Sequence, residues 1–432
     1  MNVIVLGSGG REHAIALKIS QSLILKNLYA IPGNPGTESF CENVNLDINS
    51  SDQILEFCTK KNIDLVVIGP EVPLVNGLAD LLREKGFNVF GPNAAAARIE
   101  GNKVFSKHLM EQFGIPTARF KSFTKGEFEK AEEFIRMNNF PLVLKASGLA
   151  AGKGVLICES AEEAATALKE IFRDNVFGAA GNEIVIEEFM TGEEASLFAI
   201  TDGSDFVCLP AAQDHKRIGD HDTGKNTGGM GAYAPAPVMD SATLYRVEEE
   251  ILKPTLRALR EIGSEFNGCL YCGLMITGEG PKVVEFNCRF GDPETQVVLP
   301  LLKGDFLKLL YSAATGKIDK EAVAYSGGAA ITVVAASQGY PEKYEKGFEI
   351  KGLDKTKADI IVFHAGTMKS GDKIFTNGGR VLNITAVSER NDLNHCKTRA
   401  YRALDDIKFS NIYYRHDIAD KGIRKQSTTS EI

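Results

Sequence analysis

The sequence has no tryptophan, few cysteines and no long apolar run. The absence of tryptophan excludes no class of protein. Eight cysteines at irregular spacings in 432 residues are typical of reduced cytoplasmic thiols and argue against a disulfide framework. No segment reaches the roughly 20 apolar residues that cross a bilayer, and the apolar run at residues 1–6 is too short for a signal peptide. We therefore expect a cytoplasmic protein without membrane contacts.

The net charge and the composition exclude further classes of protein. The net charge of −8 argues against nucleic acid or an anionic membrane as the main partner, although a local basic pocket for a phosphate stays open. A chain with 44% hydrophobic and 25% charged residues is typical of a globular protein, here of about two to four domains. Cys269 and Cys272 have the spacing of a zinc or redox pair, but no second pair completes a zinc site, so we expect them to pack in a strand.

The N-terminal part of the chain alternates short β-branched runs with helical stretches. We expect strands at residues 3–6, 28–31, 63–68 and 89–90, and helices at residues 11–22 and 52–61. This alternation predicts a parallel, doubly wound sheet. Ligands bind at the carboxyl ends of such strands, and those ends are occupied by the segments at residues 7–12, 32–37 and 69–71.

The rest of the chain predicts three further units. The first is a small unit at residues 118–188, with a glycine loop between strands at 141–146 and 155–158. A stretch to about residue 325 follows, with helices at 243–262 and 302–314. The last is an α+β unit from residue 327, with strands at 331–335, 360–363 and 380–385 and a helix at 391–407. We expect a loose tail after residue 421.

Residues 7–10, Gly-Ser-Gly-Gly, follow a predicted strand and precede a helix. A dinucleotide site is disfavoured because Glu12 replaces the third glycine of that motif, and no acidic residue follows the second strand to bind a ribose. Backbone N–H groups at a helix N-terminus beside Arg11 suit a phosphate monoester. The alternative is a tight turn without a ligand.

A second glycine loop runs from Lys145 to Gly154. It is not a Walker A loop, because the spacing before its lysine is one residue short and no Ser or Thr follows that lysine. With strands on both sides, it predicts a hairpin whose lysines fold over a triphosphate as a lid; an exposed hairpin without a ligand is the alternative. The strand at residues 184–188 ends in Glu187 and Glu188, and we interpret it as an edge strand whose backbone meets a base; solvated surface acids are the alternative.

Glu285 and Asn287 lie two residues apart on a predicted strand, so their side chains share one face. Two hard oxygen donors can share Mg²⁺, and Arg289 places a guanidinium fork beside them. The alternative is a half-buried polar strand end. The loop at residues 213–222 contains His and Asp residues, but a glycine-rich loop gives no fixed geometry, so we favour a substrate loop over a metal site.

Taken in order, these motifs resemble the ATP-grasp ligases and, more narrowly, the phosphoribosylamine–glycine ligase family. The resemblance runs from residue 1 to about residue 418. Its most specific strings are Gly-Ser-Gly-Gly-Arg-Glu-His at 7–13, Gly-Leu-Ala-Ala-Gly-Lys-Gly at 148–154, Gln-Asp-His-Lys-Arg at 213–217, Asn-Thr-Gly-Gly-Met-Gly-Ala-Tyr at 226–233, Glu-Phe-Asn-Cys-Arg-Phe-Gly-Asp-Pro-Glu at 285–294 and Thr-Asn-Gly-Gly-Arg at 376–380.

The resemblance implies ATP-dependent ligation of glycine to 5-phosphoribosylamine through glycyl phosphate, a step of purine biosynthesis that uses Mg²⁺ or Mn²⁺. ATP would be bound by Lys107, Lys145, Gly152, Lys153, Glu187, Phe189 and Glu194. The metal would be held by Glu285 and Asn287. The substrates would meet Gly9, Gly10, Arg11, Asn34, Gly36, Glu71 and Asp292. Arg289, Asp214 and Lys216 would serve catalysis through positioning and charge neutralisation.

The resemblance also implies an α/β and α+β multidomain chain. It predicts a doubly wound N-terminal domain (1–103), a central ATP-grasp domain (104–117 and 189–326), its lid (118–188), a C-terminal α+β domain (327–420) and the tail (421–432). We expect a monomer that contacts, transiently, the enzyme supplying phosphoribosylamine. Two residues depart from the family pattern: Ser147 stands where the lid loop usually has Asp, and Ala419 where Gly is expected.

Three alternatives to this function stay open. One is another ATP-grasp carboxylate–amine ligase, which would share the phosphate-binding residues but use a different acid. A nicotinamide oxidoreductase would need the glycine and the ribose-binding acid that are missing. A non-catalytic nucleotide-binding regulator would not need Glu285 and Asn287 for activity.

Overall fold

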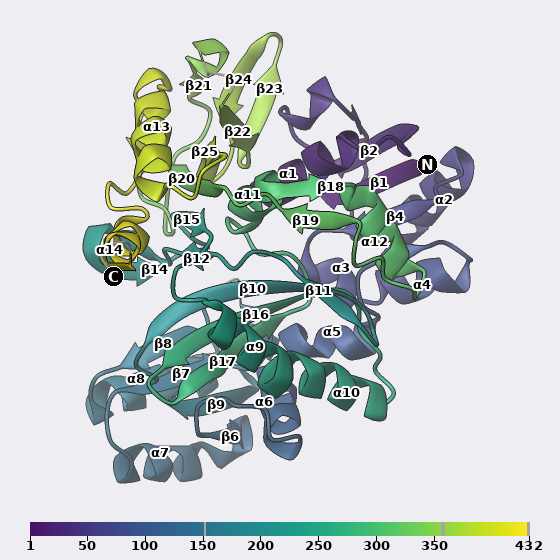
Figure 1. Cartoon of the computed structure of the whole chain (residues 1–432). Helices are drawn as coiled ribbons and strands as arrows, with labels where there is room; N and C mark the ends of the chain where they lie inside the picture. The colour runs from purple at the N-terminus through teal and green to yellow at the C-terminus, as the bar shows by residue number, and fades with distance from the viewer. Residues whose placement is uncertain (151–152, 356–358, 430–432) are drawn as a thin grey trace.

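The N-terminal domain is a five-stranded parallel sheet with helices on both faces (Figure 1). The structure is a computed structural model that describes residues 1–150, 153–355 and 359–429. Ile4 and Leu6 of β1 join one apolar core with helix α2, whereas Val3 and Val5 join a second core with helix α1, because side chains alternate between the faces of a sheet. The predicted doubly wound sheet is therefore confirmed. Its strands, in sheet order, are β3 (Glu42–Asn43), β2 (Asn27–Pro32), β1 (Asn2–Gly7), β4 (Leu65–Ile68) and β5 (Val89–Phe90), and its helices are α1 (Gly10–Ser20), α2 (Ser51–Lys61), α3 (Glu71–Val75), α4 (Leu78–Glu84) and α5 (Ala94–Gly101).

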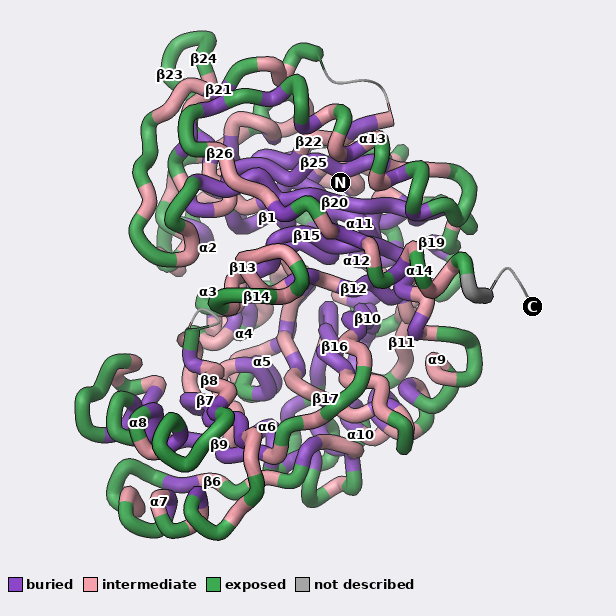
Figure 2. Tube along the Cα trace, turned by 90° about the vertical axis from the view of Figure 1, so that its left-hand side faces the viewer, coloured by how far each residue is buried: buried purple, intermediate pink, exposed green. Residues whose placement is uncertain are grey.

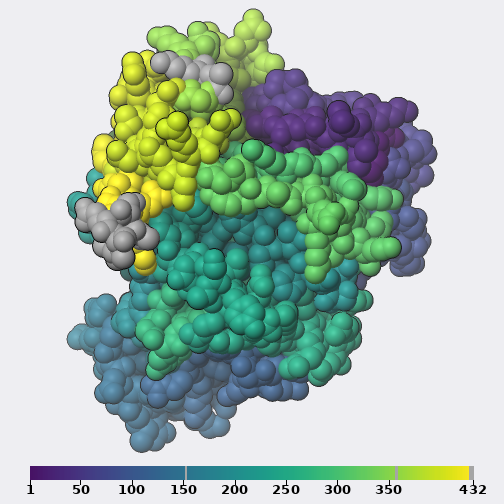
Figure 3. Space-filling model, viewed as in Figure 1, coloured from purple at the N-terminus to yellow at the C-terminus, as the bar shows by residue number. Residues whose placement is uncertain are grey.

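A small antiparallel sheet with two helices forms the lid unit, which projects at the lower left of Figures 1 and 3. The predicted hairpin is confirmed, since β7 and β8 pair in antiparallel fashion up to Lys145 and Val155. The prediction of an edge strand at residues 184–188 is wrong, because β6 and β7 pair with the two sides of β9. After α6 (Lys103–Gln112), the strands in sheet order are β6 (Phe120–Thr124), β9 (Glu183–Glu188), β7 (Leu142–Ala146) and β8 (Val155–Cys158), with helices α7 (Phe128–Met137) and α8 (Ala161–Phe172).

The central unit carries a second antiparallel sheet, in which Cys269 and Cys272 are buried as predicted. The helix predicted at residues 302–314 begins later, because Asp305 caps it by accepting a hydrogen bond from the Lys308 N–H. The residues before that cap form a short strand instead. The sheet order is β11 (Phe206–Cys208), β10 (Glu193–Asp202), β16 (Asn267–Thr277) and β17 (Gly280–Asn287); the helices are α9 (Ser241–Val247), a π-helical turn (Glu248–Leu252), α10 (Lys253–Glu261), α11 (Thr295–Val298) and α12 (Phe306–Ala314), and the short strand β18 (Leu302–Gly304) pairs with β19 (Val323–Tyr325).

The C-terminal sheet takes two strands, β12 and β15, from the middle of the chain. The predicted division puts these strands in the central domain, and its boundaries stay predictions. Figure 2 shows the buried strands β20 and β25 crossing the middle of this unit. The strands in sheet order are β12 (Gln213–Asp214), β15 (Gly231–Ala234), β20 (Ala329–Ser337), β25 (Arg380–Ser388) and β22 (Ile360–His364), with β26 (Ile412–Tyr413) beside β20, helix α13 (Leu393–Asp406), and a smaller sheet of β21 (Glu349–Ile350), β24 (Lys373–Thr376) and β23 (Thr367–Ser370).

The last described residues form helix α14 (Asp420–Thr429), so the prediction of a loose tail is wrong for them. Ile423 packs against the C-terminal core, and Lys425 Nζ lies 2.6 Å from Glu193 Oε1. These contacts come from residues far away in the chain, which the polar composition of the tail does not reveal. Ala419, just before the helix, has a φ of 70°, in the left-handed region that favours glycine. Within the described residues, no helix has the length and apolar character to span a membrane.

Candidate active site

A cleft of about 1670 Å³ opens where these units meet. Its walls come from the segments after β1 and β4, from α5 and α6, from the lid strands, from β16 and β17 and from the C-terminal unit. Gly152 lies outside the described residues. The predicted site residues that line the cleft are Arg11, Glu71, Lys107, Lys145, Lys153, Glu187, Phe189, Glu194, Asp214, Lys216, Glu285, Asn287, Arg289 and Asp292.

Two buried lysines converge on one carboxylate beneath the lid. Lys145 Nζ, at the end of β7, lies 3.1 Å from Glu187 Oε2, and Lys107 Nζ, from α6, lies 3.3 Å from Glu187 Oε1. Burial lowers the pKa of Lys107 to about 8, although Glu187 opposes this shift. Because two lysines share one carboxylate, the cluster keeps a positive charge that suits a phosphate. The backbone of Glu187 pairs with β6 and β7, and its predicted contact with adenine stays a prediction.

Glu285 and Asn287 share one face of β17, while Phe286 between them is buried on the other. Lys145 Nζ donates a hydrogen bond of 3.1 Å to the Val284 carbonyl, which brings the lid lysine next to these two donors. Burial raises the pKa of Glu285, but nearby lysines outweigh burial and hold the pKa below its usual value. An ionised carboxylate and an amide oxygen form a donor set that fits a hard divalent cation.

Arg289 links β17 to the N-terminal domain. Its Nη2 lies 2.8 Å from Glu100 Oε1, and its Nε lies 3.3 Å from Glu71 Oε2. The predicted site residues Arg289 and Glu71 are therefore in direct contact. Burial lowers the pKa of Arg289, but the two carboxylates raise it above its usual value, so the guanidinium stays charged in the cleft wall.

Arg11 and Asp292 lie on the same side of the cleft. Arg11 donates to Glu12 Oε1 at 2.5 Å and to the Phe290 carbonyl at 3.2 Å. Asp292 Oδ1 lies 3.2 Å from Arg380 Nη1. Both predicted residues are thus fixed by partners from other elements, with polar groups left facing the cleft.

Asp214 ends β12, and Lys216 follows two residues later in the cleft wall. Lys216 Nζ lies 2.6 Å from Glu194 Oε2. Burial raises the pKa of Asp214 to about 8; Glu294 and Glu194 add to this shift and Lys216 opposes it. Asp214 is therefore a carboxyl group that changes protonation near neutral pH.

Four predicted substrate residues, Gly9, Gly10, Asn34 and Gly36, are outside the described lining of the cleft. The Asn34 side chain donates to the carbonyls of Ser8 and His364, both at 2.9 Å. A Cβ at Gly36 would lie 2.2 Å from the His13 ring, and one at Gly9 would lie 2.9 Å from Glu12 Oε2. These residues shape the loops after β1 and β2, and their contact with a substrate stays a prediction.

Gly10 permits a close contact with the C-terminal sheet, so Gly10→Ala should destabilise the protein. A Cβ at Gly10 would lie 2.6 Å from both Asn383 Oδ1 and Gln296 Nε2, two side chains that are themselves buried. Overpacking of this kind costs about 1–3 kcal/mol, which calorimetry should register as a lower midpoint of thermal unfolding. Gly126→Ala is the matched control, because no atom lies within 4 Å of its Cβ position; equal midpoints for the two variants would contradict this account.

Several cleft residues are missing from the predicted set. Glu294 lines the cleft, and its Oε1 accepts hydrogen bonds from Ser196 Oγ (3.0 Å) and Tyr271 OH (2.9 Å). Lys103 and Arg380 line the cleft as well. Glu294 and Arg380 belong to the family motifs at residues 285–294 and 376–380. Lys103 is the first residue of α6 and belongs to no such motif.

The loop at residues 213–222 is more ordered than predicted. Its first residues form β12, and β13 (Arg217–Gly219) pairs with β14 (Thr223–Asn226) as a hairpin. The expectation that glycine content leaves this loop without fixed geometry is wrong, because buried polar contacts from the C-terminal segment hold the hairpin.

A parallel N-terminal domain, followed by two antiparallel sheets that enclose a cleft lined with lysines and acidic strand residues, defines an ATP-grasp protein. The chain belongs to the phosphoribosylglycinamide synthetase family: residues 1–100 match its N domain, residues 101–295 its ATP-grasp domain and residues 330–421 its C domain. The predicted fold class and the resemblance seen in the sequence are both confirmed.

Individual relatives agree with this assignment. Phosphoribosylamine–glycine ligase from Rhizobium meliloti (strain 1021) is 48% identical over 427 residues, which cover 99% of this chain and 100% of that protein. A crystal structure of phosphoribosylamine–glycine ligase from Thermotoga maritima has a TM-score of 0.84 and 35% identity, covering 96% of this chain and 100% of that chain. The biotin carboxylase domain of Hydrogenobacter thermophilus 2-oxoglutarate carboxylase, solved with MgADP, has a TM-score of 0.72 and 17% identity over 96% of this chain and 91% of its own, a likeness of fold alone.

Proposed function

We propose that this chain joins glycine to 5-phosphoribosylamine at the expense of ATP, giving glycinamide ribonucleotide, ADP and phosphate. The observation that carries the proposal is the convergence, in one cleft, of the lysines on Glu187, the donors on β17 and the N-terminal residues Arg11 and Glu71. The names of the full-length relatives support the same reaction.

ATP would lie between the lid and the central sheet. Lys107, Lys145 and Lys153 would contact its phosphates, and Glu187, Phe189 and Glu194 its nucleoside. Glu285 and Asn287 would hold Mg²⁺, or Mn²⁺, which neutralises phosphate charge when bound. The described residues contain no group of three or more His, Cys, Asp or Glu side chains that could hold a metal, so phosphate oxygens and water would complete the coordination.

The chemistry would run in two displacements. A carboxylate oxygen of glycine attacks the γ-phosphorus, and ADP leaves. The amine nitrogen of phosphoribosylamine then attacks the carbonyl carbon of glycyl phosphate, phosphate leaves, and the nitrogen loses a proton. The protein contributes mainly by positioning and charge neutralisation, with Arg11 and Glu71 holding the sugar phosphate side and Arg289 keeping the cleft wall in place. We propose that the enzyme works in the cytoplasm as a monomer that receives its amine by transient contact with the supplying enzyme.

A coupled assay of ADP release tests the proposal. We expect release that requires both glycine and freshly generated phosphoribosylamine, with glycinamide ribonucleotide identified by mass spectrometry. ADP release that needs a different acid would instead indicate another carboxylate–amine ligase. ATP binding without turnover under any of these conditions would indicate a regulator and reject the proposal.

The pH dependence of the rate should follow the ionisation of the Asp214 carboxyl group. A carboxyl group with a pKa of about 8 is mostly protonated below pH 8, so it becomes able to accept the proton of the amine as the pH rises. We expect kcat/KM for phosphoribosylamine to rise through this range and to level off above it. Asp214→Asn should lose this limb and about 10²-fold in kcat; an unchanged profile in that variant would remove Asp214 from proton transfer.

A further inference from the structure

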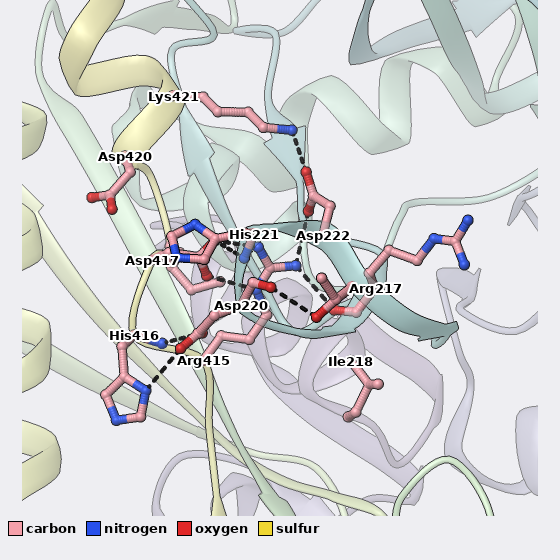
Figure 4. Close-up of polar contacts among 12 residues, drawn as sticks. Arg217, Ile218, Asp220, His221, Asp222, Arg415, His416, Asp417, Asp420 and Lys421 are labelled. Atoms are coloured by element: carbon pink, nitrogen blue, oxygen red, sulfur yellow. Dashed lines mark hydrogen bonds and ion pairs between the residues drawn. The ribbon is translucent and has the colours of Figure 1, made fainter.

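The segment after β26 lies against the β13–β14 hairpin, although the two are far apart in sequence (Figure 4). Arg415 in this segment is fully buried. Its Nε and Nη2 donate to the two carboxylate oxygens of Asp417 at 2.7 and 2.6 Å. Its Nη1 reaches into the hairpin, donating to Asp222 Oδ1 at 2.9 Å and to the Arg217 carbonyl at 3.0 Å. One guanidinium therefore joins both segments.

The neighbours of Arg415 add to this connection. Asp417 Oδ2 also accepts a hydrogen bond of 2.8 Å from the His221 N–H, and Asp220 Oδ1 accepts one of 2.8 Å from the His416 N–H. Lys421, at the start of α14, pairs with Asp222. In Figure 4 these side chains surround the turn of the hairpin, while the Arg217 guanidinium points away from them.

The turn that receives these contacts has an unfavourable backbone. His221 and Asp222 are consecutive residues with φ values of 58° and 55°, a left-handed conformation that is uncommon for non-glycine residues, although His and Asp adopt it more readily than most. Both residues are direct partners of the Arg415–Asp417 pair. The contacts with this pair therefore stabilise a backbone that two successive non-glycine residues rarely adopt.

The two ends of the hairpin lead directly to the cleft. The Thr227 N–H and Oγ1 donate to the Lys216 carbonyl at 2.7 and 2.9 Å, which closes the base of the hairpin beside Asp214. The Gly228 N–H donates to Tyr340 OH at 2.9 Å. The cleft is lined on one side of the hairpin by Asp214, Lys216 and Arg217 and on the other by Asn226, Thr227 and Gly228, so a shift of the hairpin moves this wall.

We propose that Arg415 is a positioning residue, which holds the β13–β14 hairpin so that Lys216 and residues 226–228 keep their places in the cleft. The planar guanidinium is needed because it forms a two-point contact with Asp417 and a second contact with the hairpin at the same time. The expected effect on kcat rests on the ligase activity proposed above, whereas the positioning of the hairpin by Arg415 does not depend on that activity.

Arg415→Lys tests the proposal, because lysine keeps the charge but offers a single point of contact. We expect kcat to fall about 10- to 100-fold while the KM for ATP, whose phosphates we assign to the lid lysines, changes less than about threefold. Trypsin should cleave after the exposed Lys225 of the hairpin at least about tenfold faster than in the unaltered protein. Arg399→Lys is the matched control, since Arg399 of α13 pairs with Asp359, directly before β22, and not with the hairpin; it should change neither quantity.

Asp417→Asn provides a second, milder variant if the buried substitution prevents folding. It removes one charge from the pair and should give the same pattern with smaller changes. Wild-type cleavage at Lys225 and wild-type kcat in both folded variants would overturn the proposal, as would equal acceleration of cleavage throughout the chain. The unaltered protein could show no ligase activity while trypsin still cleaves after Lys225 faster in the variants. In that case the proposed function is wrong, but the proposal that Arg415 positions the hairpin is supported.

Discussion

Replacing Glu285 with Gln should lower kcat by about 10³-fold, because the substitution keeps the shape of the side chain but removes a charge aimed at the phosphates. Glu285 is ionised, since the lysines around it hold its pKa below the usual value. A neutral amide is a weaker ligand for a hard cation. The loss should appear in the glycine-dependent release of ADP at saturating ATP, with partial recovery at high Mg²⁺ concentration.

A binding measurement separates this effect from misfolding. The Mg²⁺ concentration that half-saturates ADP binding should rise by at least about tenfold in Glu285→Gln. Glu279→Gln is the matched control, because Glu279 lies at the turn just before β17, is exposed and forms an ion pair with Lys282. An Mg²⁺ dependence equal to that of the control variant would show that Glu285 holds no metal.

Much of the site can be predicted from local patterns in the sequence. Glu285 and Asn287 share a face because a strand has a period of two, and the loops after β1 and β4 meet the cleft because parallel strands end on one edge. Such features depend on neighbours in sequence, and the structure reproduces them. The same holds for the hairpin that carries Lys145.

Contacts between distant elements could not be predicted in this way. The sequence predicts a backbone contact between Glu187 and adenine, but it does not predict that the Glu187 carboxylate meets Lys107 and Lys145, which come from two other elements. Gly10 matches a phosphate loop, yet it packs against Asn383 of the C-terminal sheet. The sequence of helix α14 has the composition of a loose polar tail, because the residues that contact the helix lie elsewhere in the chain. Tertiary packing decides each of these cases, and a single sequence carries no direct record of it.

Lys145→Met should abolish most activity and also weaken the lid. Lys145 is almost completely buried, and its Nζ lies 3.1 Å from both Glu187 Oε2 and the Val284 carbonyl. Methionine fills a similar volume without a charge, so kcat/KM for ATP should fall by about 10³-fold. Removing one partner of a buried ion pair costs up to about 3–5 kcal/mol, but Lys107 still faces Glu187, so the loss of unfolding free energy should lie at or below the lower end of that range. Lys130→Met, which affects an exposed ion pair on α7, should change neither quantity.

A comparison of ligands with and without phosphates distinguishes a lost phosphate contact from a distorted lid. If Lys145 binds the phosphates, Lys145→Met should weaken ADP binding by at least about tenfold and leave adenosine binding nearly unchanged, because only the phosphates lose a charged partner. A distorted lid would instead weaken both ligands, since the nucleoside is predicted to meet Glu187 and Phe189 on the same unit. Titration calorimetry with ADP and adenosine therefore decides whether the charge of Lys145 acts on the nucleotide directly or only through the fold around Glu187.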